Sequence, residues 1–215
     1  MAELLPERYP RTLLDHAEHT LDGRLREIAA VGERAVLVGY SLGGRLVLRA
    51  ALRAPERYAG LVVVGATAGL EDAQQRAARA QADERLAGWM EARPIEDIVG
   101  VWERQPLFAD QSDDLIEAQR AGRLSHSPPE LAALLRSCGQ GVLPPVWNEL
   151  HKLRLPFLAI AGNHDERYAE AARRLARGVP AGRAETVEHA GHAPQLQRPE
   201  AVVGLLVDFV DDHFG

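Results

Sequence analysis

The sequence predicts an α/β protein in which a mostly parallel sheet, flanked by helices, is interrupted by an inserted helical cap. Two valine-rich runs, 35–38 and 61–64, are typical of strands buried on both faces, and a helical pattern lies between them. Residues 69–152 then show helical patterns without a convincing strand, which is too long a stretch for a crossover connection. Strand patterns return at Leu155, so the sheet continues after the insertion.

The elements follow in order along this frame. Residues 11–15 favour a short strand, and Leu21–Ala30 forms an amphipathic helical pattern before the first buried strand. The expected cap helices cover 73–91, 95–104, 113–121 and 129–137, and the later core elements are a strand at 155–162, a helix at 168–177, a strand at 184–188 and a helix at 199–213. We therefore expect a core of 1–66 and 153–215 and a cap of 67–152.

Charge and composition narrow the classes of partner. The net charge is −6 and no basic run occurs, which argues against a nucleic-acid partner. Lys152 is the sole lysine, so 24 of the 25 basic residues are arginine, and a single arginine is weak evidence of function.

Compartment signals are few. Cys138 is the sole cysteine, so the chain can form no internal disulfide and has no zinc-type cysteine spacing. The N-terminal residues lack a signal-peptide layout, and no apolar stretch approaches the ~20 residues of a membrane span. We expect a cytoplasmic protein with no membrane partner.

A serine motif lies between the first buried strand and its helix. Gly39-Tyr40-Ser41-Leu42-Gly43 fits G-x-S-x-G, and the strand–turn–helix context is the one that gives this motif meaning. The turn is expected to strain the backbone of Ser41, and the flanking glycines allow close backbone approach. An ordinary strand–helix turn that contains a serine is the alternative, and we favour a nucleophile elbow.

A serine nucleophile needs a base, and the base needs an orienting acid. With such an elbow the chain order is serine, acid, histidine. Asp165 follows the strand that ends at Gly162, so it is the candidate acid, although a turn aspartate would look the same. His192 follows Gly191 before the last helix and is the candidate base. His189 competes with it, but its place near the strand end favours a packed or solvent-facing residue.

The same region allows a metal interpretation. His164, Asp165, His189 and His192 are residue types that bind metal ions. A metal site would leave the serine motif unexplained, so we expect no metal.

At this point the chain resembles the α/β-hydrolase family over about residues 4–215. The resemblance lies in the segments 39–44, 161–165 and 191–193. Within that family it resembles the MenH enzymes, the 2-succinyl-6-hydroxy-2,4-cyclohexadiene-1-carboxylate synthases of the menaquinone pathway. The cap segments that carry this closer resemblance are 70–83, which includes Arg79, 102–108, which fits W-x-x-x-P-x-F, 123–125 and 139–147.

The resemblance implies a lyase that uses the Ser–His–Asp set as a base, removes a proton from its substrate and eliminates pyruvate without a cofactor. The substrate is a small anionic carboxylate, which arginine binds in bidentate fashion. The clamps would be Arg45, Arg79 and Arg123, while Tyr40 and Trp102 would line the pocket and the backbone N–H of Leu42 would serve an oxyanion hole. Each arginine has the alternative of a solvated helix face. A serine hydrolase of esters or C–C bonds, and a degenerate, catalytically weak relative, remain alternative functions.

The N-terminal region departs from the family pattern. Only 40 residues precede Ser41, they contain no His-Gly pair, and Asp15–Thr20 stand where the family shows D-x-x-G-x-G. The leading strands and the second oxyanion donor are therefore expected to be missing. We expect either a shortened chain or a homodimer paired through the exposed sheet edge. In both cases the chain should be a weak catalyst, because one oxyanion donor can contribute about 10²–10³ in rate.

Overall fold

The computed structural model describes residues 2–32 and 34–215, which form two compact units. Among the described residues, the core unit combines 2–15, 25–32, 34–68 and 146–215, and the helical unit combines His16–Arg24 and Gly69–Pro145. Residues 16–24, which the sequence assigned to the core, join the helical unit because the His19 carbonyl accepts a hydrogen bond from Ser137 Oγ at 2.5 Å. His19 Nε2 also lies 3.7 Å from a carboxylate oxygen of Glu130.

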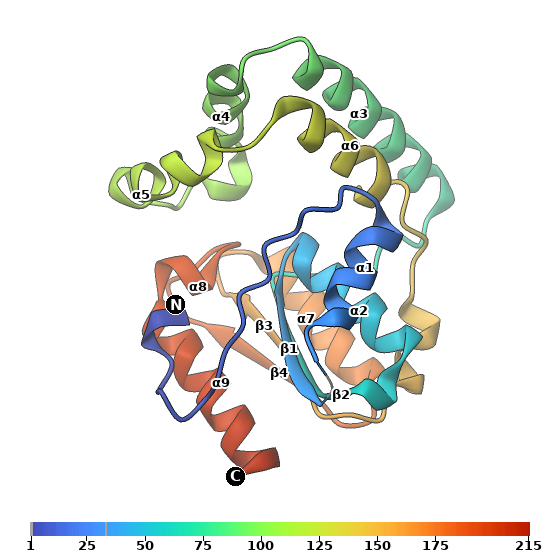
Figure 1. Cartoon of the computed structure of the whole chain (residues 1–215), viewed down its shortest axis with the longest axis vertical. Helices are drawn as coiled ribbons and strands as arrows, with labels where there is room; N and C mark the ends of the chain where they lie inside the picture. The colour runs from blue at the N-terminus through green and yellow to red at the C-terminus, as the bar shows by residue number, and fades with distance from the viewer. Residues whose placement is uncertain (1, 33) are drawn as a thin grey trace. The chain divides into compact units, whose positions relative to one another are not determined.

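The core unit contains a four-stranded parallel sheet in the order β1-β2-β3-β4 (Figure 1). Its strands are β1 (Ala35–Tyr40), β2 (Tyr58–Val64), β3 (Phe157–Gly162) and β4 (Gly182–Val187). Val38 pairs with Val62, and Val62 with Leu158, so the apolar runs of the sequence are in register. The predicted α/β class with a parallel sheet is confirmed.

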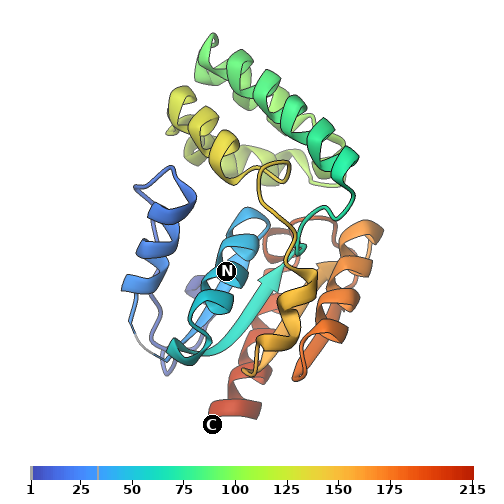
Figure 2. The same ribbon diagram turned by 90° about the vertical axis from the view of Figure 1, so that its right-hand side faces the viewer.

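Helices cover both faces of this sheet. Figures 1 and 2 show α2 and α7 against one face and α9 against the other. On the α9 side, Val202, Leu206 and Phe209 pack with the buried valine and leucine side chains of β2 and β3. The helical elements of the core unit, with α1 shared with the helical unit, are η1 (Ala2–Leu4), α1 (Leu21–Ala30), α2 (Leu42–Arg53), η2 (Pro55–Arg57), η4 (Trp147–Lys152), α7 (Glu166–Gly178), α8 (Pro194–Gln197) and α9 (Pro199–Phe214).

The helical unit has no strand among its described residues. Its elements are α3 (Ala73–Glu91), α4 (Ile95–Glu103), η3 (Pro106–Phe108), α5 (Asp113–Leu124) and α6 (Pro128–Cys138). A small apolar cluster of Ala87, Met90, Ile98 and Ala132 joins α3, α4 and α6. The predicted helices therefore exist, with ends that differ by a few residues.

The N-terminal segment differs from its prediction. Residues 11–15, expected as a strand, have no regular structure, and Leu13 is exposed. Within the described chain, β1 pairs only with β2, and Val38 of β1 is 44% exposed. Pairing of this edge with a second copy stays a prediction. Across residues 2–32 and 34–215, no helix is both long and apolar enough to cross a bilayer.

Candidate active site

Ser41 sits in the sharp turn between β1 and α2. Its backbone has φ 48° and ψ −108°, a positive-φ conformation that a residue with a side chain seldom adopts. Two hydrogen bonds hold it there, from Ser41 N to the Val64 carbonyl at 2.8 Å and from Arg45 N to the Ser41 carbonyl at 3.1 Å. The strained turn thus presents the hydroxyl at the carboxyl end of β1, and Leu42 places its N–H at the start of α2.

The glycines around Ser41 are not equivalent. A Cβ at Gly39 would lie 2.5 Å from the Gly43 carbonyl oxygen, and one at Gly44 would lie 2.6 Å from the Ala66 methyl group. A Cβ at Gly43 would meet no atom within 4 Å. The close approach expected of both flanking glycines therefore applies to Gly39, while the second tight position is Gly44 rather than Gly43.

Three side chains of the core unit lie in one hydrogen-bonded row, which we call the reactive row: Asp165, His192 and Ser41. His192 Nδ1 is 2.8 Å from Asp165 Oδ2, and His192 Nε2 is 3.1 Å from Ser41 Oγ. Since an ionised carboxylate can only accept, Nδ1 carries the proton, and Nε2 is left to accept from the serine hydroxyl. His192 is only 2% exposed, so water competes little for these bonds.

Asp165 has two roles in the local structure. It is the N-cap of α7, and its Oδ1 accepts a hydrogen bond from the backbone N–H of Tyr168 at 3.3 Å. Oδ2 is then left to face His192. The turn interpretation of Asp165 and the orienting interpretation are therefore compatible, because each uses a different oxygen.

The loop that carries His192 is held by hydrogen bonds that the sequence did not predict, one of them to Gln197, which no pattern in the sequence singled out. Gly191 N donates to Gln197 Oε1 at 2.8 Å, and His164 N donates to the Ala190 carbonyl at 2.9 Å. Gly162 allows this approach, because a Cβ there would overlap the carbonyl oxygens of Ala190 and Gly191.

Gly65 has a similar function at the end of β2. It has φ +55°, and a Cβ would lie 2.8 Å from the His192 carbonyl oxygen. A glycine at the carboxyl end of each strand is the available sequence signal for both positions, but nothing in the sequence says which loop passes over them.

The predicted substrate residues of the core unit lie near the reactive row. The Tyr40 ring centroid is 5.5 Å from that of His192, with the rings inclined by 54°. Arg45 lies in the first turn of α2, and its backbone N–H binds the Ser41 carbonyl.

In the helical unit, Arg79 and Trp102 have local partners. Arg79 Nε donates to Asp83 Oδ1 at 2.6 Å, and Asp83 is buried. Trp102 is partly exposed on α4, with its ring centroid 5.7 Å from that of Phe108. Asp83 was not noticed in the sequence, although its i,i+4 spacing from Arg79 is a signal for such a pair.

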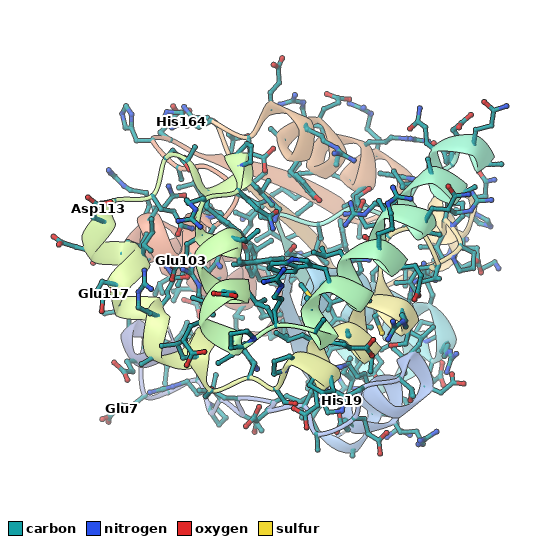
Figure 3. All side chains as sticks on the ribbon, turned by 90° about the horizontal axis from the view of Figure 1, so that it is seen from above. Glu7, His19, Glu103, Asp113, Glu117 and His164 are labelled. Carbon is teal, nitrogen blue, oxygen red and sulfur yellow. The ribbon has the colours of Figure 1, made fainter. Side chains whose placement is uncertain are left out.

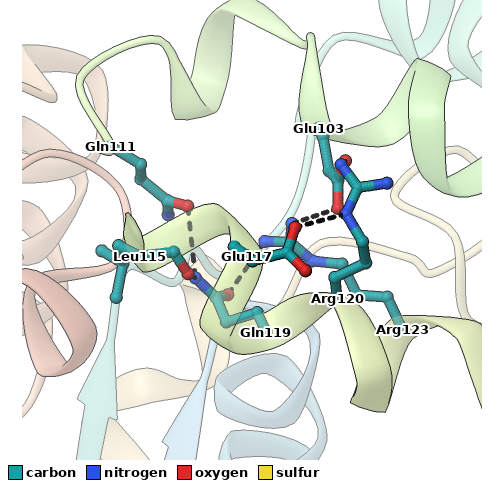
Figure 4. A network of polar contacts seen from close by, with 7 residues as sticks. All are labelled: Glu103, Gln111, Leu115, Glu117, Gln119, Arg120 and Arg123. Carbon is teal, nitrogen blue, oxygen red and sulfur yellow. Dashed lines mark hydrogen bonds and ion pairs between the residues drawn. The ribbon is translucent and has the colours of Figure 1, made fainter. Parts of the chain in front are cut away.

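Arg123 belongs to a polar network around the buried carboxylate of Glu103 (Figure 4). Arg123 Nη1 donates to Glu103 Oε1 at 3.1 Å and Nη2 to Gln119 Oε1 at 2.9 Å, while Arg120 Nη2 donates to Glu103 Oε2 at 2.5 Å. The Glu103 side chain is 6% exposed, whereas Glu117, which pairs with Arg120 Nε, is 74% exposed and lies at the outer edge in Figure 3. The guanidinium of Arg123 is thus engaged by protein acceptors at both of its terminal nitrogens.

The histidines near the reactive row do not gather into a metal site. Within residues 2–32 and 34–215, no three His, Cys, Asp or Glu side chains are arranged to hold a metal ion. His189 is exposed, and its ring centroid lies 6.3 Å from that of His164. His192, rather than His189, is the histidine whose ring reaches Ser41.

Comparisons with known proteins place this geometry in a family. A model of the alpha/beta hydrolase family matches residues 5–205. A protein of Bacillus subtilis (strain 168) is 32% identical over 177 residues, covering 81% of this chain and 65% of the relative. The 2-succinyl-6-hydroxy-2,4-cyclohexadiene-1-carboxylate synthase of Escherichia coli O1:K1 / APEC is 31% identical over 174 residues, covering 81% and 67%. The chain thus spans about two thirds of the length of these relatives.

Solved structures show the same fold. MenH from S. aureus superposes with a TM-score of 0.87 at 23% identity, covering 96% of this chain and 81% of the other. A thermophilic esterase from Thermogutta terrifontis superposes with a TM-score of 0.71 at 21% identity, covering 96% and 78%. At these identities the likeness concerns the fold alone.

Proposed function

Because the chain belongs to the α/β-hydrolase family, we propose that it is a lyase of the MenH type, acting on an anionic cyclohexene carboxylate of menaquinone biosynthesis. In this reaction a base removes a proton from the substrate ring, the electron pair of that C–H bond enters the ring to make the second double bond, and the bond to the pyruvyl group breaks. The pyruvyl group leaves with the electron pair of the broken bond as the enolate of pyruvate, which takes up a proton to give pyruvate, and the cyclohexadiene carboxylate remains. No acyl-enzyme is formed.

The observation that carries the proposal is the hydrogen-bonded row of Ser41, His192 and Asp165. In the proposed role, His192 accepts the proton through the Ser41 hydroxyl, and Asp165 stabilises the imidazolium that results. Both hydrogen bonds are within the reach that proton transfer requires. The N-terminus of α2, which begins at Leu42, supports a place for negative charge beside Ser41.

Arginine chemistry supports the anionic substrate class. In the proposal Arg45, Arg79 and Arg123 bind substrate carboxylates, with Tyr40 and Trp102 lining the pocket, as the resemblance to MenH enzymes implies. The bond from Arg79 Nε to Asp83 leaves its two terminal nitrogens for a carboxylate. Arg123 would have to share its terminal nitrogens with Glu103 and Gln119, so we expect Arg79 to contribute more to substrate affinity.

A serine hydrolase is the second candidate function, since the same row can activate Ser41 as a nucleophile. A neutral ester has no need of carboxylate-binding arginines, so the two functions respond differently to their loss. This difference separates the candidates by experiment.

The test is release of pyruvate from the cyclohexene carboxylate precursor, measured beside hydrolysis of a short-chain p-nitrophenyl ester. The lyase proposal expects pyruvate release that is lost in Ser41→Ala. It also expects Arg79→Ala to weaken binding of the precursor by about 2–5 kcal/mol, while kinetics with the ester change little. Ester hydrolysis without pyruvate release would favour the hydrolase over the lyase. An equal loss of activity toward both substrates in Arg79→Ala would show that Arg79 has a structural role.

A further inference from the structure

We propose that Tyr168 is a positioning residue that holds the imidazole of His192 and the carboxylate of Asp165 in the reactive row. The inference rests on the proposed use of that row as a base, and it adds a residue from α7 that lies outside the row. Tyr168 is 7% exposed and contacts two members of the row, one through its ring and one through its backbone.

The first contact is between aromatic rings. The ring centroids of Tyr168 and His192 are 4.4 Å apart and the ring planes are inclined by 60°, an edge-type geometry that aromatic pairs favour. The two hydrogen bonds of His192 act at Nδ1 and Nε2, so they resist rotation about the line between these atoms only weakly. A ring packed against the imidazole restrains that remaining motion.

The second contact fixes the carboxylate. The backbone N–H of Tyr168 donates to Asp165 Oδ1 at 3.3 Å, and Oδ2 of the same carboxylate meets His192 Nδ1. Because α7 begins at Glu166, Tyr168 stands in the first turn of the helix, where a capping side chain accepts from the backbone N–H groups. The turn that caps α7 therefore also orients the acid toward the histidine.

The ring contact has a consequence for the reacting state. Proton transfer requires the imidazole to stay in line between Ser41 and Asp165, and the Tyr168 ring restrains it in that orientation. Tyr40 lies on the same imidazole at a centroid distance of 5.5 Å, so the effect of Tyr168 is partly shared. Loss of the Tyr168 ring should therefore lower kcat rather than raise KM.

The test compares Tyr168→Leu, which removes the aromatic ring, with Tyr168→Phe, which keeps the ring and removes only the hydroxyl group. Phe209→Leu is the matched control, because Phe209 is a buried aromatic residue of the core unit that packs on His213 and Phe214 instead of His192. The readout is the proton NMR signal of His192 Nδ1–H in water. The proposal expects the signal in the unaltered chain, in Tyr168→Phe and in Phe209→Leu, and its loss or broadening in Tyr168→Leu.

The kinetic readout is hydrolysis of p-nitrophenyl acetate. Tyr168→Leu should lower kcat by about 10- to 100-fold, the scale of a small misplacement of a reacting group, with little change in KM. A signal and a kcat that survive in Tyr168→Leu would overturn the proposal. Equal losses in Phe209→Leu would also overturn it, because the effect would then follow from general loosening of the core.

The NMR measurement needs no substrate, so it separates this inference from the lyase proposal. A chain that releases no pyruvate but shows the ring-dependent signal would retain the role of Tyr168 and lose the proposed reaction. Absence of the signal from the unaltered chain would overturn the role of Tyr168. If Tyr168→Leu does not fold, Tyr168→Met fills the same space with an unbranched side chain and gives the same two outcomes.

Discussion

The reactive row of the core unit and the Glu103 network of the helical unit are both built from buried polar groups, but they are assembled in different ways. The row joins residues 41, 165 and 192, which are brought together because parallel strands deliver their following loops to one edge of the sheet. The Glu103 network joins α4 to α5, two helices that are neighbours along the chain. The topology of the sheet thus determines the first arrangement, and side-chain pairing determines the second.

This difference has an energetic consequence. In the row, the two hydrogen bonds of His192 join groups that can exchange a proton, and glycines in the surrounding backbone allow close approach. In the network, one buried carboxylate accepts hydrogen bonds from two guanidinium groups, so its removal would leave both cations without that partner. We therefore expect changes in the row to affect turnover and changes in the network to affect stability.

The largest expected effect is on turnover. Asp165→Asn should lower kcat by about 10⁴-fold, the scale seen when an orienting acid is replaced by an amide. Asparagine caps a helix about as well as aspartate, so the free energy of unfolding should change little. Ester or lyase kinetics, measured together with urea denaturation, compare the loss of turnover with the loss of stability. A loss of stability large enough to account for the lost turnover would contradict the expectation that changes in the row act on turnover alone.

The next effect is on stability. Glu103→Gln should lower the free energy of unfolding by about 1–3 kcal/mol, because the buried carboxylate accepts charge-assisted hydrogen bonds from Arg120 and Arg123 that a neutral amide replaces only in part. Glu117→Gln, which breaks an exposed pair with the same Arg120, should cost less than about 1 kcal/mol. Urea denaturation of both variants measures the difference, and equal costs would show that burial of Glu103 does not decide the energy.

A smaller effect tests the glycines of the elbow. Gly39→Ala should destabilise the core by about 1–3 kcal/mol, because its methyl group would overlap the Gly43 carbonyl. Gly43→Ala places a methyl group in open space within α2 and should stabilise the chain by about 0.5–1 kcal/mol. Thermal unfolding of both variants measures the sign of each change in stability. Destabilisation by both would show that Gly43 as well as Gly39 requires glycine, contrary to the difference in their surroundings.

The smallest effect depends on pH and lies on the surface of the helical unit. Hydrogen bonds from Arg136 lower the pKa of Glu84 and of Glu91 below their usual value. A carboxyl whose folded pKa is lowered contributes stability above its unfolded pKa of about 4.3 and loses it as pH falls through the folded value. Arg136→Ala should therefore lower Tm at pH 7 and converge with the unaltered chain in strong acid.

Arg85→Ala, at an exposed position of α3, the helix that carries Glu84 and Glu91, is the control for this pH effect. It should show no comparable dependence of Tm on pH. A gap between Arg136→Ala and the unaltered chain that stays constant down to strong acid would mean that Arg136 acts through packing rather than charge.

The same contrast explains what the sequence could predict. The strands, the cap helices and the candidates Ser41, Asp165 and His192 follow from local patterns and from their order along the chain. Gly162, Gln197 and Tyr168 could not be found this way, because their importance lies in contacts with a loop or ring distant in sequence.

The arginines also show a limit of what the sequence can predict. Arg79 and Arg123 stand at positions that the resemblance to MenH enzymes marks, but the sequence does not say how much of each guanidinium is already in use. Asp83 engages one nitrogen of Arg79, while Glu103 and Gln119 engage both terminal nitrogens of Arg123. Only the packed helices reveal that difference, and their roles toward substrate stay predictions.

The most direct test of the central claim, that the core unit holds Ser41 ready for proton transfer to His192, is covalent labelling with a fluorophosphonate followed by peptide mass spectrometry. The claim predicts one adduct, on Ser41, formed rapidly in the unaltered chain and far more slowly in His192→Ala and Asp165→Asn. Labelling of Ser41 at the same rate in all three chains, or no adduct on Ser41 at all, would contradict it.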